Sequence, residues 1–423
     1  MLVFSIAIAT LLMGLPVVFV LGMVSLAYLY SQGMPLVLVA QRLFVGMDSF
    51  VLLAIPFYIL MGDIMCQGKV TDILVNWAKT IVGRVRGGLG AVTIIVEIIF
   101  SGISGSGSAD ASALGSILIP AMEKEKYDKD FAAAVVATAS ILGPIIPPSI
   151  IMVVYAVVAE ESIGALFLAG IIPGLIMGGA DILIVLWQSY RRKYSRAERR
   201  ATFREFLQQT REAALALMAP GIILAGILTG FVTPTEAGIL AVVYCLFLAM
   251  IYYKTLTWRD MPRLLYNTVL VSCGAYLLVG MCSIFGWVMS AQGIPAKLAA
   301  FILSITTNKF AILFLINIVF LVAGCVMESI AAIILLVPIF LPLTKSLGVD
   351  PVHLGLIVCL NLSVGFVTPP VGASLFILGG LTKLSIDKIA RACFPFIVVN
   401  ILILFWLTYS PGIVMWLPKL IFK

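Results

Sequence analysis

Charged residues are scarce in this sequence. Only 11% of its 423 residues are Asp, Glu, Lys or Arg, whereas 62% are hydrophobic. A water-soluble domain carries charge at roughly a quarter of its positions, so this scarcity excludes an ordinary soluble protein. Many segments run almost without charge for the roughly 18 residues that a helix needs to cross a hydrocarbon layer of ~30 Å. The composition therefore predicts an all-α, polytopic membrane protein in a lipid bilayer.

Histidine and paired cysteines are lacking as well. The single histidine is His353, and no two of the seven cysteines have metal-ligand spacing. A His or Cys metal cluster is therefore excluded, the cysteines are expected to be small core residues, and His353 is expected to be interfacial or structural. The cysteines are Cys66, Cys245, Cys273, Cys282, Cys325, Cys359 and Cys393. The net charge of +7 does not indicate nucleic acid, because basic residues collect in the cytoplasmic loops of membrane proteins.

Two stretches depart from the lipid-like pattern. Thirteen of the sixteen residues 101–116 are Gly, Ala or Ser, and residues 143–149 read Gly-Pro-Ile-Ile-Pro-Pro-Ser. Non-helical backbone is tolerated at bilayer depth only where protein or a water-filled cavity surrounds it, because an unpaired amide in hydrocarbon costs several kcal/mol. Both stretches therefore predict a buried polar site.

The arrangement of apolar arms around these stretches predicts two hairpins and two broken helices. Residues 87–122 form two arms of ~22 Å, each too short to cross the bilayer, and indicate a re-entrant helical hairpin. Residues 131–158 indicate a span broken at the prolines, which cannot donate an amide hydrogen bond. Residues 308–342 and 352–381 show the same two patterns again.

The rest of the chain predicts ordinary spans. Residues 34–45 are expected to lie along the bilayer surface, residues 69–86 are amphipathic, and the first apolar segment is expected to be a retained span and not a signal peptide. The expected spans are residues 2–30, 48–65, 162–187, 213–231, 237–253, 266–290 and 389–407. With the amino terminus inside, 21 of the 27 basic residues fall on the cytoplasmic side, including the cluster at residues 191–211.

An internal repeat relates the two halves. An offset of 222 residues pairs Gly102 with Gly324, Pro120 with Pro342, Asp128 with Asp350, Gly143 with Gly365, and Pro147-Pro148 with Pro369-Pro370. An odd number of predicted crossings separates the copies, so the repeat is expected to be inverted. Residues 1–211, with the cytoplasmic basic loop, form the first predicted unit, and residues 212–423 form the second. Inverted repeats are typical of secondary transporters, which bind substrate and coupling ions at the midplane.

The chemistry expected at the hairpin tips and helix breaks favours a small cation together with an anion. Half-helix carboxyl ends and unwound carbonyls suit Na⁺, whereas helix amino termini and serine hydroxyls suit a carboxylate. The predicted Na⁺ ligands are Ser104, Ser106, Gly143 and Pro147 in the first half and Gly324, Met327, Gly365 and Thr368 in the second. Substrate is expected between them, near Ser106, Ser149 and Glu328.

The chain resembles the large membrane subunit of tripartite ATP-independent periplasmic (TRAP) transporters. The resembling stretches are residues 101–115, 146–149, 231–238, 335–343 and 367–372. This resemblance implies an elevator-type transporter fold in the bacterial inner membrane and Na⁺-coupled import of an organic acid, with two or more Na⁺ ions. It also implies a small membrane partner subunit and a periplasmic substrate-binding protein. Dicarboxylates, sugar acids, keto acids and sialic acid all remain open as substrates.

Several alternatives stay open at the level of sequence. Many TRAP relatives have Asp where this chain has Glu328, whose carboxylate either serves substrate or ion binding or caps a helix. The small-residue patch is also typical of close helix packing, and the role of Glu97 is undecided. Asp63 and Asp181 are expected near interfaces or paired, and residues 233–236 are expected to cap a helix.

Two other functions compete with a partner-dependent importer. A stand-alone ion antiporter would need more buried carboxylates than this chain shows. An intramembrane serine hydrolase would use the Gly-x-Ser-Gly pattern at Ser104 and would need His353 as its base.

Overall fold

The computed structural model describes residues 15, 17–82, 85–194 and 202–422, and within these ranges the chain forms helices and turns without a β-strand. Seven helical segments of the described chain are long and apolar enough to cross a membrane. They are α10 (Ile163–Arg191), α11 (Phe203–Leu228), α12 with the π-helical turn η1 (Pro234–Tyr252), α13 (Met261–Ala291), α15 (Lys309–Val326), α16 (Ser329–Ser346) and α19 (Ile386–Tyr409). The all-α, multi-pass prediction is confirmed.

Both predicted hairpins and both broken helices are present. The first hairpin consists of α6 (Gly88–Ser104) and α7 (Gly107–Lys124), and the second of α15 and α16. The first broken helix is α8 (Lys129–Ala139) with α9 (Ile150–Ala159), and the second is α17 (Pro351–Gly365) with α18 (Ala373–Thr382). The first break begins at Ser140, three residues earlier than expected. Each break contains one cis Pro-Pro bond.

The 222-residue offset extends to the bounds of the helices. Shifted by 222, α7 covers residues 329–346, which are the bounds of α16. The packing repeats as well: α7 lies on α18 while α16 lies on α9, and α8 lies on α19 while α17 lies on α10. The two halves are therefore interlocked around a pseudo-twofold relationship, as an inverted repeat requires.

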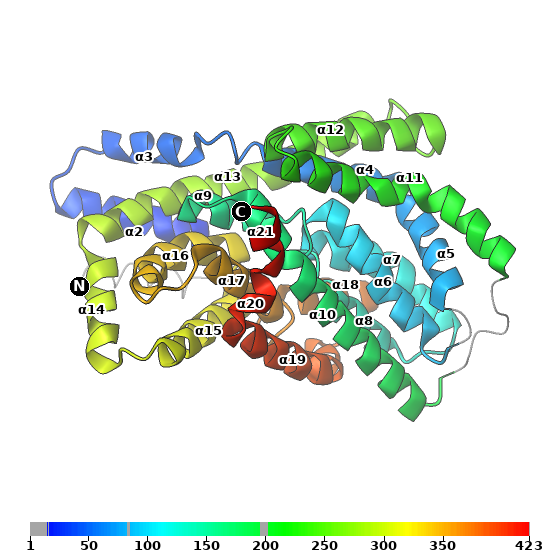
Figure 1. Ribbon diagram of the computed structural model, residues 1–423. Helices are drawn as coiled ribbons and strands as arrows, with labels where there is room; N and C mark the ends of the chain where they lie inside the picture. Colours follow the sequence, from blue (N-terminus) through cyan, green and yellow to red (C-terminus); the bar gives the residue numbers. More distant parts are fainter. Residues whose placement is uncertain (1–14, 16, 83–84, 195–201, 423) are drawn as a thin grey trace.

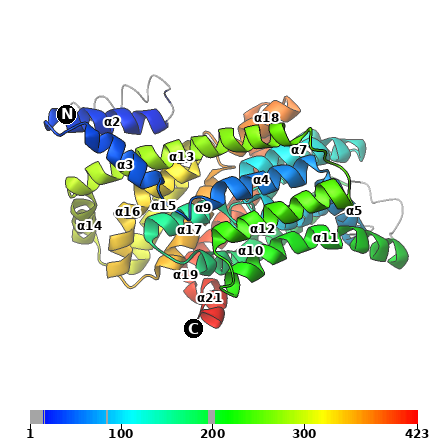
Figure 2. The same cartoon turned by 90° about the horizontal axis from the view of Figure 1, so that it is seen from above.

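The two hairpins and the two broken helices, together with α10 and α19, form an inner body. A separate group of helices lies along one side of it. The group consists of α2 (Val17–Ser31), α3 (Val37–Met47), α4 (Ala54–Gln67), α11, α12 and α13. In Figure 1 the helices α3, α13, α4, α11 and α12 run along the top, above α15, α17, α19, α10 and α8, and Figure 2 shows the same group from above. Two long-range hydrogen bonds hold α4 to α12, from Tyr58 Oη to Pro234 O (2.9 Å) and from Thr235 Oγ1 to Phe50 O (2.8 Å). We call this group the outer layer.

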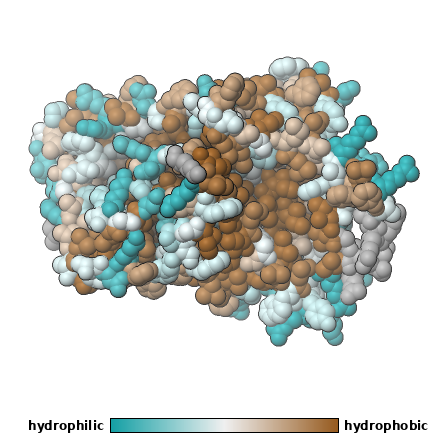
Figure 3. All heavy atoms as spheres, viewed as in Figure 1, coloured by the Kyte–Doolittle hydropathy of each residue, from teal (hydrophilic) through white to brown (hydrophobic). Residues whose placement is uncertain are grey.

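The surface reflects the membrane environment. Figure 3 shows a continuous apolar area over the centre and right of one face, with hydrophilic side chains gathered beyond it at the right-hand and lower ends. Exposed apolar side chains such as Leu183, Val269 and Leu402 contribute to such faces. Water would penalise this exposure, whereas lipid does not.

Some predicted bounds were wrong. The predicted span 48–65 begins as helix only at Ala54, because residues 50–53 form turns and Pro56 is tolerated only in a first helical turn. Helix α11 begins ten residues before the predicted 213, because Thr202 and Glu205 form a capping box there. Residues 2–14 and 16 of the predicted span 2–30 lie outside the described residues, as do Arg84 and residues 195–201 of the basic cluster.

Four helices complete the described chain. The amphipathic arm predicted at 69–86 is α5 (Val70–Val82). Its repeat equivalent, α14 (Ile294–Ile305), was not predicted, and neither were the short helices α20 (Pro411–Val414) and α21 (Trp416–Ile421). The predicted cysteine pattern holds for the five buried cysteines, but Cys66 is half-buried and Cys273 is exposed on α13.

Candidate transport site

The tip of the first hairpin is sharper than the small-residue pattern predicted. Only Gly105 and Ser106 separate α6 from α7. Gly105 has φ +62°, a left-handed conformation that glycine adopts readily and that lets the chain reverse. Ile150 N donates to Gly105 O (3.3 Å), so the tip is fastened to the start of α9. Most of the small residues are thus helical and allow close packing.

Asp110 is the residue of this tip that sequence reasoning missed. It is fully buried in the first turns of α7, and Ser104 Oγ donates to its Oδ1. Its Oδ2 has no hydrogen-bond partner in the described protein and lies where a Cβ atom on Gly143 would overlap it. One signal was available, because Asp110 is the sole ionisable residue in the patch 101–116 and such residues at membrane depth are functional candidates.

Glu97 lies next to this acid. Its side chain is 1% exposed and within hydrogen-bonding reach of the Asp110 carboxyl group, so Glu97 faces protein and not lipid. Ser101 Oγ donates to the Glu97 backbone carbonyl (2.6 Å) and lies 3.4 Å from Oε1. No Lys or Arg forms an ion pair with either acid in the part of the chain that the structure describes. The first hairpin therefore encloses two acids without a basic partner.

The first helix break brings two further predicted residues, Gly143 and Pro147, to the tip. A Cβ atom on Gly143 would lie 3.1 Å from the carbonyl carbon of Ser106, and Pro147 O lies 3.5 Å from the Cβ position of Gly102. The Ser106 side chain is half-buried, and its hydroxyl pairs with Ser108 Oγ (3.1 Å). The structure thus places Ser104, Ser106, Gly143 and Pro147 around one tip.

Ser149 belongs to the same break, but its hydroxyl is already engaged. Ser149 is fully buried, donates to Pro144 O (2.6 Å) and accepts from Met152 N (3.3 Å). It is the N-cap of α9. A substrate role for Ser149 therefore requires that these hydrogen bonds be shared or exchanged.

The second half repeats the contact between a hairpin tip and a helix break, but it has no acid at the position equivalent to Asp110. A Cβ atom on Gly365 would lie 2.5 Å from the carbonyl carbon of Gly324, so the break presses against the tip. Gly372 N also donates to Cys325 O (3.4 Å). Thr368 Oγ1 donates to Val364 O (2.7 Å), which leaves its lone pairs available. The position equivalent to Asp110 is Ala332, so the four predicted Na⁺ ligands of this half supply neutral oxygen atoms only, and the carboxylate at this tip is that of Glu328.

Met327 and Glu328 form the turn between α15 and α16. Met327 N donates to Ala323 O (2.9 Å) and ends α15. Glu328 Oε2 accepts from Ile330 N (3.1 Å) and Ala331 N (3.3 Å), so its carboxylate caps α16. The residue is exposed. The structure shows the capping alternative, and the exposed position leaves room for a ligand.

The two halves meet at their breaks. Ser140 Oγ lies 3.3 Å from Ser374 Oγ, which joins the end of α8 to the start of α18. A Cβ atom on Gly107 would lie 3.4 Å from the ring of Phe366 in the second break. The first hairpin tip therefore contacts both breaks, as a site shared by two repeats requires.

Other candidates are structural. His353 Nε2 lies 3.2 Å from Leu407 O, whereas the Ser104 hydroxyl is bonded to Asp110, so the Ser-His pair of a hydrolase is not formed. Thr233 and Glu236 form the predicted capping box at the start of α12. No group of three metal-ligating His, Cys, Asp or Glu side chains occurs among the residues described.

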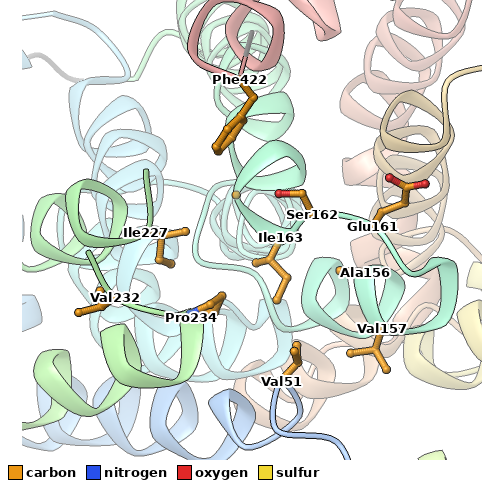
Figure 4. A pocket seen from close by; sticks show the side chains of 11 residues that line it. Val51, Ala156, Val157, Glu161, Ser162, Ile163, Ile227, Val232, Pro234 and Phe422 are labelled. Atoms are coloured by element: carbon orange, nitrogen blue, oxygen red, sulfur yellow. The ribbon is translucent and has the colours of Figure 1, made fainter. Parts of the chain in front are cut away.

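Two cavities lie away from the tips, on either side of α9. The first has a volume of about 300 Å³ between α9, α10, the α11–α12 turn and Phe422; Figure 4 shows the Phe422 ring, Ile227 and Val232 around it, with Glu161 and Ser162 on one wall. The second, of about 380 Å³, lies between α9 and residues of α3 and α13. Val157 lines both. Both cavities therefore lie at the boundary between the inner body and the outer layer.

An all-helical membrane protein with two interlocked hairpins, two broken helices and a buried polar centre has the architecture of a secondary transporter. The fold is similar to the YdaH transporter of Alcanivorax borkumensis, with a TM-score of 0.65 and 14% identity over 92% of this chain and 89% of that chain. Residues 4–413 match the family described as "Tripartite ATP-independent periplasmic transporter, DctM component". The chain belongs to this family and is therefore a TRAP transporter large permease subunit, not an enzyme.

Three relatives illustrate the range of the family. The isethionate TRAP transporter permease protein DctMQ of Oleidesulfovibrio alaskensis is 40% identical over 96% of this chain, which spans 64% of that relative's length. The sialic acid TRAP transporter large permease protein SiaM of Vibrio cholerae is 38% identical over 96% of this chain and 95% of its own. The C4-dicarboxylate TRAP transporter large permease protein DctM of Rhodobacter capsulatus is 35% identical over 100% of this chain and 99% of its own length.

Proposed function

We propose that this protein is the permease subunit of a Na⁺-coupled importer that moves an organic anion across the bacterial inner membrane. A periplasmic substrate-binding protein delivers the anion, and a small membrane subunit completes the complex. The single observation that carries the Na⁺ proposal is the buried Asp110, whose Oδ2 accepts no hydrogen bond within the described residues and lies against Gly143. A buried carboxylate without a counter-charge is costly in a membrane interior, and a bound cation removes that cost.

The residues present fit Na⁺. Hard cations prefer carboxylate, hydroxyl and carbonyl oxygens, and Asp110, Ser104, Ser106 and the first break offer these groups together. The carboxyl end of α6 adds partial negative charge at the same place. Gly324, Met327, Gly365 and Thr368 offer only neutral oxygens, so the two proposed Na⁺ sites differ in charge. When bound, Na⁺ would compensate the acids and draw the tip toward the break.

The substrate class follows from charge. The names of the three relatives specify isethionate, sialic acid and C4-dicarboxylates, which are all anions. No Lys or Arg is buried in the described ranges, so an anion in the centre must be balanced by Na⁺ and by helix amino termini. We place its carboxylate near Ser106, whose side chain is half-buried at the amino end of α7, with Ser149 and Glu328 as further contacts. Which acid is carried differs among relatives and is left open.

We also propose that transport is an elevator-like movement of the inner body against the outer layer. The two bodies are each held together by extensive packing, and the contacts between them include two close approaches of small residues. Gly62 of α4 lies against Ser104, and Gly102 of α6 lies against Pro220 of α11. Small residues permit helices to approach closely without interdigitated side chains, which favours sliding.

Uptake in proteoliposomes tests this function. The permease is reconstituted with its small subunit and binding protein, and labelled organic acids are supplied with an inward Na⁺ gradient. We expect uptake that stops when choline replaces Na⁺ and when the binding protein is omitted. Full uptake in choline would contradict Na⁺ coupling, and ion exchange without the partner proteins would favour a stand-alone antiporter.

A further inference from the structure

A second buried acid lies outside the site described above. Asp181 of α10 and Asn400 of α19 face each other, and both side chains are 0% exposed. Asn400 Nδ2 donates to Asp181 Oδ1 (3.1 Å) and Oδ2 (3.4 Å). Because α10 and α19 occupy equivalent places in the two repeats, this contact is a direct polar link between the halves of the inner body.

No Lys or Arg among the described residues forms an ion pair with Asp181. Within the described residues its carboxyl group accepts from Asn400, and the Cys393 thiol of α19 is a titratable group near it. Several titratable groups on the other helices packed against α10 are engaged elsewhere. Glu97 of α6 is directed toward Asp110, Asp130 of α8 toward Arg192, Tyr155 of α9 toward Pro351 and His353 of α17 toward Leu407.

If Asp181 is ionised, one buried polar group of the Asp181–Asn400 pair is left without a hydrogen-bond partner. Asn400 Oδ1 is buried and has no partner within the described protein. Turning the amide around would not help, because the oxygen would then face an ionised carboxylate that has no hydrogen to donate, and the NH₂ group would lose its partner. In either orientation a buried polar group is left unpaired, which native proteins avoid.

A proton on the carboxyl group resolves this imbalance. We propose that Asp181 is a proton-binding site, occupied throughout the transport cycle, in which a neutral carboxylic acid and the Asn400 amide form two reciprocal hydrogen bonds. The acid O–H donates to Asn400 Oδ1, and Asn400 Nδ2 donates to the acid carbonyl. The proton comes from water and no other group changes its charge. The pair braces the two repeats without adding a charge to the moving body, and this role is independent of which ion or substrate is carried.

Infrared difference spectroscopy of the purified complex in lipid tests the proposal. We expect the difference spectrum between the wild type and Asp181→Asn at neutral pH to show the carbonyl band of one protonated carboxyl group, present in the wild type and lost in the variant. The matched control is Asp350→Asn, which removes an exposed carboxylate at the start of α17 and should leave that band in place. Loss of an ionised carboxylate band from Asp181→Asn in place of the acid band would overturn the proposal.

Two further measurements keep the test decisive. Asn400→Leu leaves Asp181 intact but removes its partner, so the acid band should remain and shift in frequency; an unshifted band would overturn the reciprocal pair. Asp181→Asn reproduces a neutral side chain of the same shape, so its uptake and the pH profile of uptake should match the wild type within about twofold. A folded Asp181→Asn complex that has lost uptake would show that the negative charge is required.

Discussion

Asp128 and Asp350 occupy equivalent positions in the two repeats, but only Asp350 caps the helix that follows it. Asp350 Oδ1 accepts from Val352 N (2.9 Å) and His353 N (3.4 Å). Asp128 makes no such cap, because its Oδ2 accepts from Arg192 Nη1 (2.9 Å) and Tyr194 Oη (2.7 Å) beyond the end of α10. The same residue type is thus a helix cap in one half and a clasp between the first broken helix and α10 in the other.

Breaking the clasp should cost a small, pH-dependent amount of stability. Hydrogen bonds from Tyr194 and Arg192 lower the pKa of Asp128, so its contribution is complete above the ordinary Asp pKa of about 4 and is lost as pH falls through the lowered value. We expect Asp128→Asn to reduce the free energy of unfolding by less than about 1 kcal/mol at pH 7, because the pair is largely exposed. Thermal unfolding in detergent checks this. The difference from wild type should shrink below about pH 4, and an Asp128→Asn, Arg192→Leu double variant should lose less than the sum of the single losses.

Removing the acid at the first hairpin tip should weaken Na⁺ binding. Asp110→Asn keeps the shape but removes the charge that faces Gly143, so we expect the Na⁺ concentration for half-maximal uptake to rise roughly tenfold or more, as on loss of a ligand or its support. Ser104→Ala should have a smaller effect in the same direction. Asp63→Asn, at a half-buried position of α4, is the control. An unchanged Na⁺ dependence in Asp110→Asn would exclude Asp110 from the ion site.

Replacing the break glycine by alanine in either half should push the helix break away from the hairpin tip that it contacts. A Cβ atom on Gly143 would overlap Asp110 Oδ2, and one on Gly365 would lie 2.5 Å from the backbone of Gly324. Because backbone cannot move aside cheaply, we expect Gly365→Ala to reduce uptake more strongly than Gly143→Ala. Gly179→Ala, which meets nothing within 4 Å, is the matched control. Uptake at the wild-type rate in Gly365→Ala would show that this contact is not needed.

Glu328 can be tested separately as a cap and as a charge. Glu328→Ala removes the cap of α16 and should lower stability by about 0.5–2 kcal/mol. Glu328→Asn can still cap the helix, so we expect an unchanged melting temperature and reduced uptake if the carboxylate contacts substrate or ion, as proposed. Wild-type uptake by Glu328→Asn would leave capping as its whole role. Uptake and thermal unfolding are measured on the same preparation.

Filling the cavities beside α9 should hinder movement of the inner body. Val157 lines both cavities, so Val157→Trp would place a bulky ring between the inner body and the outer layer. We expect Na⁺-dependent uptake to fall several-fold while Na⁺ binding, followed by thermal stabilisation, is kept. Val157→Ala, which enlarges the same space, should transport normally. If Val157→Trp transports at the wild-type rate, the boundary beside α9 does not change during the cycle.

Much of the fold could be predicted from sequence. Gly and Pro alter backbone conformation and amide donation locally, so the hairpins around Gly105 and Met327 and the two Pro-Pro breaks are legible without a structure. The 222-residue offset was found from six positions, five of them Gly or Pro, and then held for α7 and α16 at both ends. The start of α11 at Thr202 and Glu205 was missed because residues 202–212 are largely polar, and the predicted bound followed the apolar segment that begins at 213.

The site could be predicted only in part. Gly143, Gly324 and Gly365 were identified because the repeat pointed to them, and Ser104 because it lies in the small-residue patch; the structure places all four at the hairpin tips and breaks. The importance of Asp110 was missed, since its meaning depends on an unpaired oxygen that faces a glycine from another helix.

The sequence by itself determined that the chain spans a membrane, repeats itself and breaks its helices at two places, because these properties depend on hydrophobicity and backbone chemistry of neighbouring residues. Tertiary structure alone decided which acids face each other, which remain without a counter-charge, and why Asp128 and Asp350 differ. Those outcomes depend on residues far apart in the chain, and burial changes the energy of a charge far more than any local sequence preference does.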